Sequence, residues 1–484
     1  MKKSVFKSSV AIALLFNLTA CGQKPHQSEL SRLTTAIVTN DSDIANESIL
    51  ACVAANADIA SKLTCLPSIK NVQEVFANVP AGYRRFDMTI EQPVDHLYPE
   101  GRKFSQKLIL WHRGESEPMI LHASGYKIFN EQLYLLADRW KTNQIQVSHR
   151  YFTGSEPTQG ELDWSKMTVA QSAADFHRIV VSLKQVYTKN WVNNGGSKGG
   201  MTSVFFRRYY PNDLSGTVAD VAPLSFARED SRYIDFVDHV GGDDMAECRT
   251  KLRDLQRVFL TRRTEFLTRM PANTTYDYLG GPDVAFEHTI ISVPYAFHQY
   301  HNMRPTDAVS CGTLPPADAS AEILWNWLQK TNAVSGDEQT KIFVPYYYQA
   351  NTELGGSADR LDLIADLLQH PYSALMYGPK NTPQIYADDV MRDMEHWLKT
   401  ESQGIMYVYG ESDPWTAGMF PFRPEADSFR FTVPKGNHSS KFTDLPTDTK
   451  AQFVDTLSRW LGKQMPVEFM APAYTPKEDP QIRL

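Results

Sequence analysis

One serine of the chain stands where it could act as a nucleophile. Residues 195–199 read Gly-Gly-Ser-Lys-Gly, so Ser197 fits the pattern G-x-S-x-G, a sharp turn from strand to helix that exposes the hydroxyl above a sheet edge. Glycine suits the flanking positions, because side chains at Gly195 and Gly199 would collide across the turn. The pattern alone is weak in a chain with 26 glycines, but a predicted helix precedes it and another follows it directly. The sequence therefore predicts a nucleophile at Ser197.

An acid and a base follow Ser197 in the order that such a site requires. Asp413 and His438 each come after an apolar run that reads as a strand, and the carboxyl ends of parallel strands meet at one edge of a sheet. We expect His438 to take the Ser197 proton while Asp413 holds the imidazole in the correct tautomer. Glu411 is the rival acid, but the proline and tryptophan after Asp413 give it the stiffer setting. Ser197, Asp413 and His438 form the predicted triad.

Backbone groups near the serine should stabilise the negative charge that develops on an acyl oxygen. One donor is expected to be the N–H of Lys198, the residue after the nucleophile, at the N-terminus of the following helix. The other is expected from the loop after the predicted strand 119–122, around Gly125 and Tyr126. With the triad, these groups predict acyl transfer through a covalent intermediate.

Strand-like and helix-like stretches alternate along much of the chain. Apolar residues recur at helical spacing in residues 169–187, and a further helix is predicted at 49–61. This alternation indicates the α/β class, with a mostly parallel sheet covered by helices on both faces. The predicted strands are residues 107–111, 119–122, 145–148, 217–221, 404–409 and 429–433.

Strand signals thin out between about residues 226 and 395, where helical patterns dominate. The simplest arrangement is an α/β-hydrolase fold with a mostly helical cap inserted between the nucleophile and the acid and base residues. Predicted cap helices include residues 249–267, 321–328 and 361–368. We expect the first part of the hydrolase domain at 49–225, the cap at 226–395 and the second part of the hydrolase domain at 396–484.

The first residues predict export from the cell. Three lysines precede an apolar run at residues 10–18 that is too short to span a bilayer, the pattern of a signal peptide. It ends in Leu-Thr-Ala-Cys-Gly, which looks like the lipobox of bacterial lipoproteins, in which the cysteine is acylated and becomes the first mature residue. We expect Cys21 to anchor the protein to a membrane, at the periplasmic face or the cell surface, with residues 22–48 as a tether. An ordinary signal peptide with a chance cysteine is the alternative.

Four cysteines remain after Cys21, and an even number in an exported protein suggests two disulfide bonds. Four cysteines allow three pairings, of which proximity favours Cys52–Cys65 and Cys248–Cys311. Neither a C-x-x-C pair nor an H-E-x-x-H motif occurs, so we expect no metal and no other cofactor. The net charge of −7 gives no basic footprint for nucleic acid. The sequence leaves the oligomeric state open.

Beyond the triad, several segments resemble those of secreted bacterial serine peptidases of the prolyl tri/tetrapeptidyl aminopeptidase type. The resemblance runs from about residue 83 to 461, and its most specific part is the run S-K-G-G-M-T at 197–202. The other matching segments are Q-P-V-D-H at 92–96, G-Y at 125–126, H-R-Y-F at 149–152, Y-P-N-D at 210–213, V-A-P at 221–223, Y-G-E-S-D-P-W at 409–415 and G-N-H at 436–438.

This resemblance implies a serine peptidase that releases short peptides, tripeptides above all, from free N-termini. Related lysosomal-type prolyl carboxypeptidases and dipeptidyl peptidases share the architecture, which allows a preference for proline. A substrate ammonium needs a buried carboxylate as its partner, and Glu353 is the candidate, with a surface acid on a helix as the alternative. The rival functions are an esterase or lipase with the same triad and a non-catalytic surface protein on a hydrolase scaffold.

Overall fold

The structure, a computed structural model, describes residues 47–158, 160–304 and 307–467. The expected signal peptide, Cys21 and nearly all of the expected tether lie outside the described residues. Within the described ranges, no helix is both long enough and apolar enough to cross a membrane.

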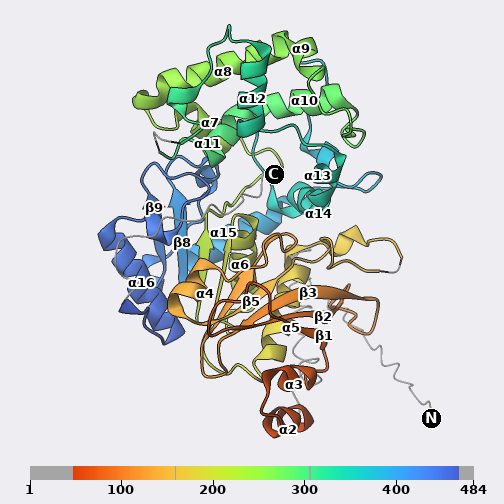
Figure 1. Cartoon of the computed structure of the whole chain (residues 1–484), viewed down its shortest axis with the longest axis vertical. Coiled ribbons are helices and arrows are strands. Elements are labelled where there is room, and N and C mark those ends of the chain that lie inside the picture. Colours follow the sequence, from red (N-terminus) through yellow and green to blue (C-terminus); the bar gives the residue numbers. More distant parts are fainter. Residues whose placement is uncertain (1–46, 159, 305–306, 468–484) are drawn as a thin grey trace, which may run out of the picture.

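A nine-stranded sheet forms the centre of the molecule (Figure 1). Its strand order is β1-β2-β3-β5-β4-β6-β7-β8-β9, and the pairs β1–β2, β2–β3 and β3–β5 are antiparallel. All pairs from β5 to the β9 edge are parallel, so their carboxyl ends meet at one edge of the sheet. The strands are β1 (Ile69–Val75), β2 (Arg84–Pro93), β3 (Lys103–His112), β4 (Met119–Ala123), β5 (Asn143–Val147), β6 (Trp191–Gly196), β7 (Gly216–Asp220), β8 (Ile405–Gly410) and β9 (Phe429–Val433).

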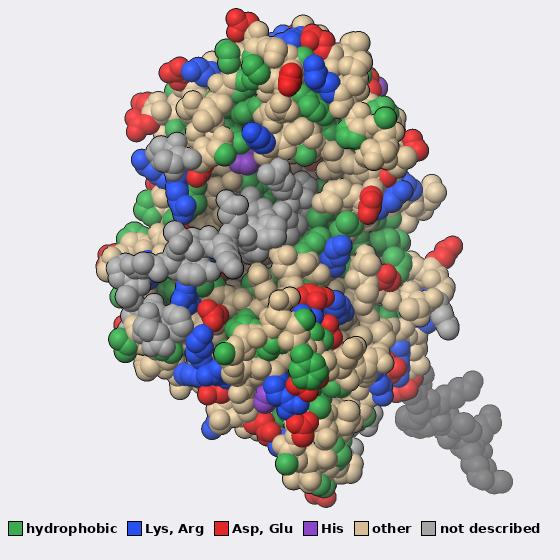
Figure 2. All heavy atoms as spheres, viewed as in Figure 1, with side chains coloured by type: hydrophobic (Ala, Val, Ile, Leu, Met, Phe, Trp, Pro, Cys, Tyr) green, Lys and Arg blue, Asp and Glu red, His purple; other side chains and the backbone are tan. Residues whose placement is uncertain are grey.

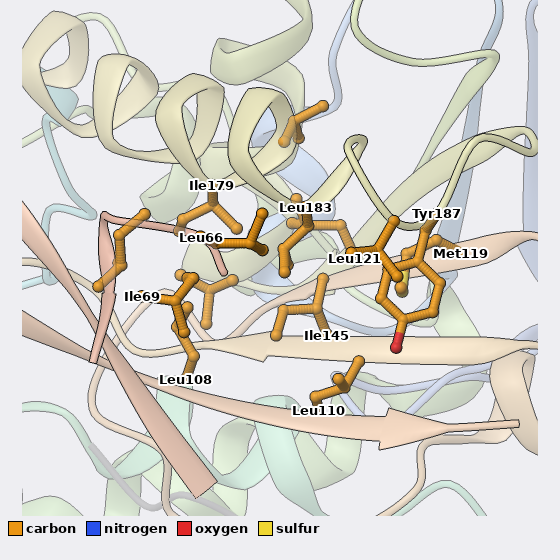
Figure 3. Close-up of a cluster of buried hydrophobic side chains, with 14 of the residues drawn as sticks. Leu66, Ile69, Leu108, Leu110, Met119, Leu121, Ile145, Ile179, Leu183 and Tyr187 are labelled. Carbon is orange, nitrogen blue, oxygen red and sulfur yellow. The ribbon is translucent and has the colours of Figure 1, made fainter. Parts of the chain in front are cut away.

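Helices cover both faces of this sheet. On one face, Ile179 and Leu183 of α5 lie against Leu108, Leu121 and Ile145 of the strands (Figure 3). The helices α6 and α15 pack on the same face, and α4 and α16 pack on the opposite one. A mostly parallel sheet between two helical layers confirms the predicted α/β-hydrolase class. The helices are α4 (Leu135–Trp140), α5 (Val169–Leu183), α6 (Lys198–Tyr209), α15 (Asp388–Thr400) and α16 (Thr447–Leu461).

The central strand β6 carries two asparagines and is nevertheless buried over most of its length. Asn193 donates a hydrogen bond through Nδ2 to the Ser203 carbonyl oxygen at 3.0 Å, and Asn194 Oδ1 lies 3.2 Å from His122 Nδ1. Hydrogen-bonded amides can be buried at a much lower cost than unpaired ones. These contacts explain why the strand that leads to Ser197 is less apolar than a central strand usually is.

A layer of helices between β7 and β8 in the chain lies above the carboxyl edge of the sheet, and we call it the cap (Figure 1). The cap has its own apolar core, which includes Leu252, Phe259, Phe286 and Leu328. Its helices are α7 (Arg232–His239), α8 (Ala246–Thr261), α9 (Arg263–Leu267), α10 (Pro282–Ile291), α11 (Val293–Tyr300), α12 (Ala321–Thr331), α13 (Asp337–Ile342) and α14 (Val344–Gln349).

Two predicted helices differ from those of the structure. Residues 361–368 form turns and no helix, although Ile364 is buried in the cap core. The apolar spacing there reflects the packing of an irregular segment. The predicted helix at 49–61 is divided into α2 (Glu47–Ala55) and α3 (Ile59–Thr64), because Asp58 caps the second helix by accepting a hydrogen bond from the Ala60 N–H.

The helix α15 joins the cap to the sheet. Val390, Met391 and Met394 on its buried face pack with residues of α6 and with Tyr407 of β8. It therefore belongs to the core of the sheet domain, and the expected cap boundary at residue 395 falls inside it.

The structure contains two disulfide bonds, Cys52–Cys65 and Cys248–Cys311, the pairing that proximity favours. The first ties α2 to the end of α3, and the second ties α8 to the loop before α12 across 63 residues of the cap. Acidic and basic side chains are intermixed over the face shown in Figure 2. Because exposed ion pairs contribute little to stability, we assign most of the stability to the cores and the disulfides.

Removal of the cap disulfide should destabilise the cap. A cross-link restricts the unfolded chain, and in the chain-entropy model a loop of 63 residues is worth about 4 kcal/mol in the free energy of unfolding. We expect the double variant Cys248→Ser, Cys311→Ser to unfold at lower urea concentration, followed by circular dichroism. The variant Cys52→Ser, Cys65→Ser is the control, with a smaller loss because its loop has 13 residues. An unchanged midpoint for the cap variant would contradict this.

Candidate active site

Ser197 lies in the turn between β6 and α6. Its backbone has φ 54° and ψ −125°, a conformation that few side chains adopt and that costs on the order of 1–3 kcal/mol. The Ser197 N–H donates a hydrogen bond to the Asp220 carbonyl oxygen at 2.8 Å. A Cβ atom at Gly195 would lie 2.4 Å from the Gly199 backbone, which explains the glycine at that position. The local backbone is therefore the strained turn that the G-x-S-x-G pattern predicts.

The predicted acid and base contact each other. Asp413 follows β8 and is fully buried, and its Oδ2 lies 2.7 Å from His438 Nδ1. Burial raises the pKa of Asp413, and its contact with His438 opposes this shift. Asp413 Oδ1 also accepts a hydrogen bond from the Trp415 N–H at 3.1 Å, which fixes the orientation of the carboxylate.

Glu411, the rival acid, points elsewhere. It is exposed, and its carboxylate accepts a hydrogen bond from the Lys435 N–H at 2.7 Å. His438 therefore pairs with Asp413 and not with Glu411.

His438 and Ser197 lie at the same edge of the sheet without a direct hydrogen bond. His438 Nε2 is buried and has no hydrogen-bond partner among the described residues. The rings of His438 and Trp415 lie 6.3 Å apart, and Trp415 lines the same small cavity as Ser197. The structure thus joins two of the three predicted residues directly and brings the third to their neighbourhood.

The loop after β4 presses against the start of α6. Gly125 has φ 72°, and a Cβ atom there would lie 2.4 Å from the Gly199 nitrogen and 2.8 Å from the Lys198 carbonyl carbon. Burial raises the pKa of the Tyr126 phenol well above its ordinary value, and an interaction with the Ser197 side chain opposes this shift. The residues expected around the oxyanion therefore gather next to Ser197.

A small cavity in front of Ser197, which we call the front cavity, has largely apolar and aromatic walls. Tyr126 and Met201 come from the sheet domain, and Tyr346 and Gly355 come from the segment between β7 and β8. The other lining residues are Lys198, Pro223, Ser225 and Trp415. A small and largely apolar space of this kind suits a compact apolar side chain.

The cap also holds the loop that carries His438. The His438 N–H donates a hydrogen bond to the Gln299 carbonyl oxygen of α11 at 2.8 Å. The Tyr300 ring meets the His438 ring edge to face, with centroids 5.9 Å apart. No sequence motif points to Gln299, since a backbone carbonyl makes the contact. The position of the base thus depends on a helix of the cap.

Glu353 lies in a single π-helical turn, Ala350–Leu354, and is buried, in contrast to the surface acid of the alternative interpretation. Its Oε2 accepts a hydrogen bond from the Val169 N–H at 2.7 Å, at the first residue of α5. A carboxylate is stabilised at a helix N-terminus by the free N–H groups and the helix dipole. The described residues contain no group of three side chains that could ligate a metal ion.

The comparisons with known proteins agree with this geometry. The family described as PS-10 peptidase S37 matches residues 53–474. The chain belongs to this family. It is 35% identical over 423 residues to the prolyl tri/tetrapeptidyl aminopeptidase of Streptomyces mobaraensis, covering 84% of this chain and 86% of that protein. The protein is therefore a serine peptidase, as the resemblance in the sequence implies.

Two further comparisons show weaker similarity, one over a smaller part of the chain and one with a low TM-score. The peptidase is 25% identical over 158 residues to the lysosomal Pro-X carboxypeptidase of Bos taurus, covering 28% of this chain and 31% of that protein. Among solved structures, the peroxisomal alpha-beta-hydrolase Lpx1 of Saccharomyces cerevisiae is 10% identical, with a TM-score of 0.35, and the match covers 84% of this chain and 95% of that chain.

The contact between Asp413 and His438 predicts a difference between two acids of the peptidase. Asp413→Asn should fold normally and lose about 10⁴-fold in kcat, because an amide favours the wrong imidazole tautomer. Glu411→Gln is the matched control and should keep nearly full activity, since Glu411 contacts only the backbone of a neighbouring loop in this region. Steady-state kinetics on a peptide anilide measures both. Equal losses in the two variants would reject Asp413 as the acid.

Proposed function

We propose that this peptidase is an exported serine exopeptidase that releases short peptides, tripeptides above all, from free N-termini. The observation that carries the proposal is the buried pair of Asp413 and His438 beside a strained serine, under a helical cap. Membership of the peptidase family and the 35% identity to an aminopeptidase support the reaction class.

In the proposed reaction, His438 Nε2 takes the proton of the Ser197 hydroxyl as its oxygen attacks the carbonyl carbon of the scissile bond. The carbonyl oxygen becomes an oxyanion, which the Lys198 N–H and the loop at Gly125 and Tyr126 stabilise. His438 returns the proton to the leaving amine, and the C–N bond breaks to give an acyl-enzyme. Water, activated by His438, then hydrolyses the ester and restores Ser197.

The proton transfer requires His438 Nε2 and the Ser197 hydroxyl to come within hydrogen-bonding distance, because Nε2 has no partner among the described residues. Catalytic hydrogen bonds often tighten only when substrate is bound. The phenol of Tyr126, which interacts with the Ser197 side chain, would then be released to donate to the oxyanion.

The presence of the cap supports the proposal that the enzyme is an exopeptidase. Gly355 and Tyr346, from the segment between β7 and β8, form part of the wall of the front cavity, and a site covered in this way would admit a chain end more readily than the middle of a folded chain. Glu353, buried in the same segment, is proposed to neutralise the substrate ammonium. The aromatic walls of the front cavity suit a proline ring at the cleaved bond, in agreement with the name of the Streptomyces mobaraensis relative.

We also propose that the mature protein is exported and held at a membrane by lipid on Cys21. The two disulfides support this location, because such bonds persist in oxidising compartments.

A pair of substrates tests the requirement for a free N-terminus. We expect a tripeptide anilide that ends in proline to be cleaved with kcat/KM roughly 100-fold above that of its acetylated form, since a buried carboxylate without its ammonium partner is costly. Glu353→Gln should remove most of this difference while retaining an acceptor for the Val169 N–H. Equal cleavage of both substrates by the native enzyme would reject the exopeptidase. If Glu353→Gln kept the full difference between the free and acetylated substrates, the role of Glu353 would be rejected and the exopeptidase assignment would stand.

A further inference from the structure

A second cavity lies behind the nucleophile, between the first turns of α5 and α6, and we call it the rear cavity. It shares Lys198 and Met201 with the front cavity, so these two side chains lie between the two spaces. Thr202 completes the α6 side, while Val169 and Ser172 come from α5 and Gln349 comes from α14. The proposed reaction uses none of these side chains. It uses only the backbone N–H of Lys198, as an oxyanion donor.

Lys198 lines the rear cavity, and its amine has no hydrogen-bond partner among the described residues. The residue is 2% exposed, and its Nζ makes no hydrogen bond to any described residue. Nζ lies 5.9 Å from the ring centroid of Tyr126 and 5.8 Å from that of Phe152, so two aromatic faces favour a cation there. Burial lowers the pKa of this amine well below its ordinary value. A lysine is rarely buried in this way unless it is paired.

The surroundings favour a negative charge beside the amine. The N-termini of α5 and α6 both lie at this cavity, and helix N-termini attract anions. The carboxylate of Glu353 accepts a hydrogen bond from the Val169 N–H and so compensates the N-terminus of α5. The N-terminus of α6 and the buried amine of Lys198 remain as the positive groups beside this cavity.

We propose that the rear cavity binds a monatomic anion of the halide class, held by the ammonium of Lys198. The hydroxyls of Ser172 and Thr202 already donate to the backbone carbonyls of Thr168 and Lys198, so the other polar side chains of the wall are those of His149 and Gln349. A phosphate or sulfate would leave several oxygens without a donor, whereas a halide needs only a few contacts. The remaining wall includes apolar side chains, which suit a weakly hydrated ion: Val169, Ala173, Met201, Phe205 and Leu354.

The site would support the active centre through the Lys198 side chain. Lys198 also forms part of the wall of the front cavity, and its backbone N–H is a proposed oxyanion donor. An anion that fixes the ammonium in the rear cavity also fixes the first turn of α6. Lys198 then acts as a positioning residue through its side chain.

Thermal unfolding of the full chain tests the site without reference to catalysis. In gluconate buffer at constant ionic strength, added chloride should raise Tm by roughly 2–4 °C and then saturate, because a ligand that binds only the folded state stabilises it. Lys198→Met should abolish the rise. Lys184→Met is the matched control and should keep it, since the Lys184 amine is half-buried and donates to the Asp213 carbonyl oxygen. Equal chloride effects in the two variants would overturn the proposal.

Diffraction from crystals of the native protein in bromide provides a readout that does not depend on a variant. We expect an anomalous peak in the rear cavity within hydrogen-bonding distance of Lys198 Nζ. A water molecule there, with no anomalous signal, would overturn the proposal and make Lys198 a neutral, hydrated amine. Both outcomes are independent of whether the substrate is a peptide with a free N-terminus.

Discussion

The hydrogen bond between Asp413 and His438 joins two loops that follow neighbouring parallel strands. A fully buried carboxylate needs a partner, because its desolvation is costly, and the imidazole N–H supplies one at 2.7 Å. The loops are pressed together around this contact: the Ser412 N–H donates to the Gly436 carbonyl oxygen at 2.7 Å, and a Cβ atom at Gly410 would lie 2.4 Å from the Asn437 oxygen. The parallel register of β8 and β9 makes the pairing of acid and base possible, and the strained turn after β6 brings Ser197 to the same edge.

The cap does more than cover this edge. Its helix α11 holds the loop of His438 through the Gln299 carbonyl and the Tyr300 ring, while its own core and disulfide keep that helix in place. The segment that carries Glu353 also contributes Tyr346 and Gly355 to the wall of the front cavity. Substrate access and the position of the base are thus linked through one layer of the protein. In the proposed exopeptidase, this link between cap and base would favour chain ends, because the cap would have to keep its contacts while substrate reaches the serine.

Much of the site could be predicted from the sequence because strained turns and strand ends leave local signals. The glycines around Ser197, and the apolar runs before Asp413 and His438, identify these residues without knowledge of their contacts. Other features leave no such signal. The Gln299 contact with His438 uses a backbone carbonyl, which any residue could supply. Residues 361–368 have apolar residues at helical spacing, although they form turns against the cap core. The burial of Lys198 is equally invisible, since lysine is ordinarily exposed and only the tertiary structure surrounds this one with aromatic rings.

We propose that one serine, Ser197, is activated by one histidine, His438, at this edge of the sheet. A fluorophosphonate probe tests it most directly, because it reacts only with an activated serine and leaves a mass label on the modified peptide. We predict a single label on Ser197, absent in Ser197→Ala and formed far more slowly in His438→Gln, with both variants folded. Labelling of a different serine, or undiminished labelling of Ser197 in His438→Gln, would contradict the account.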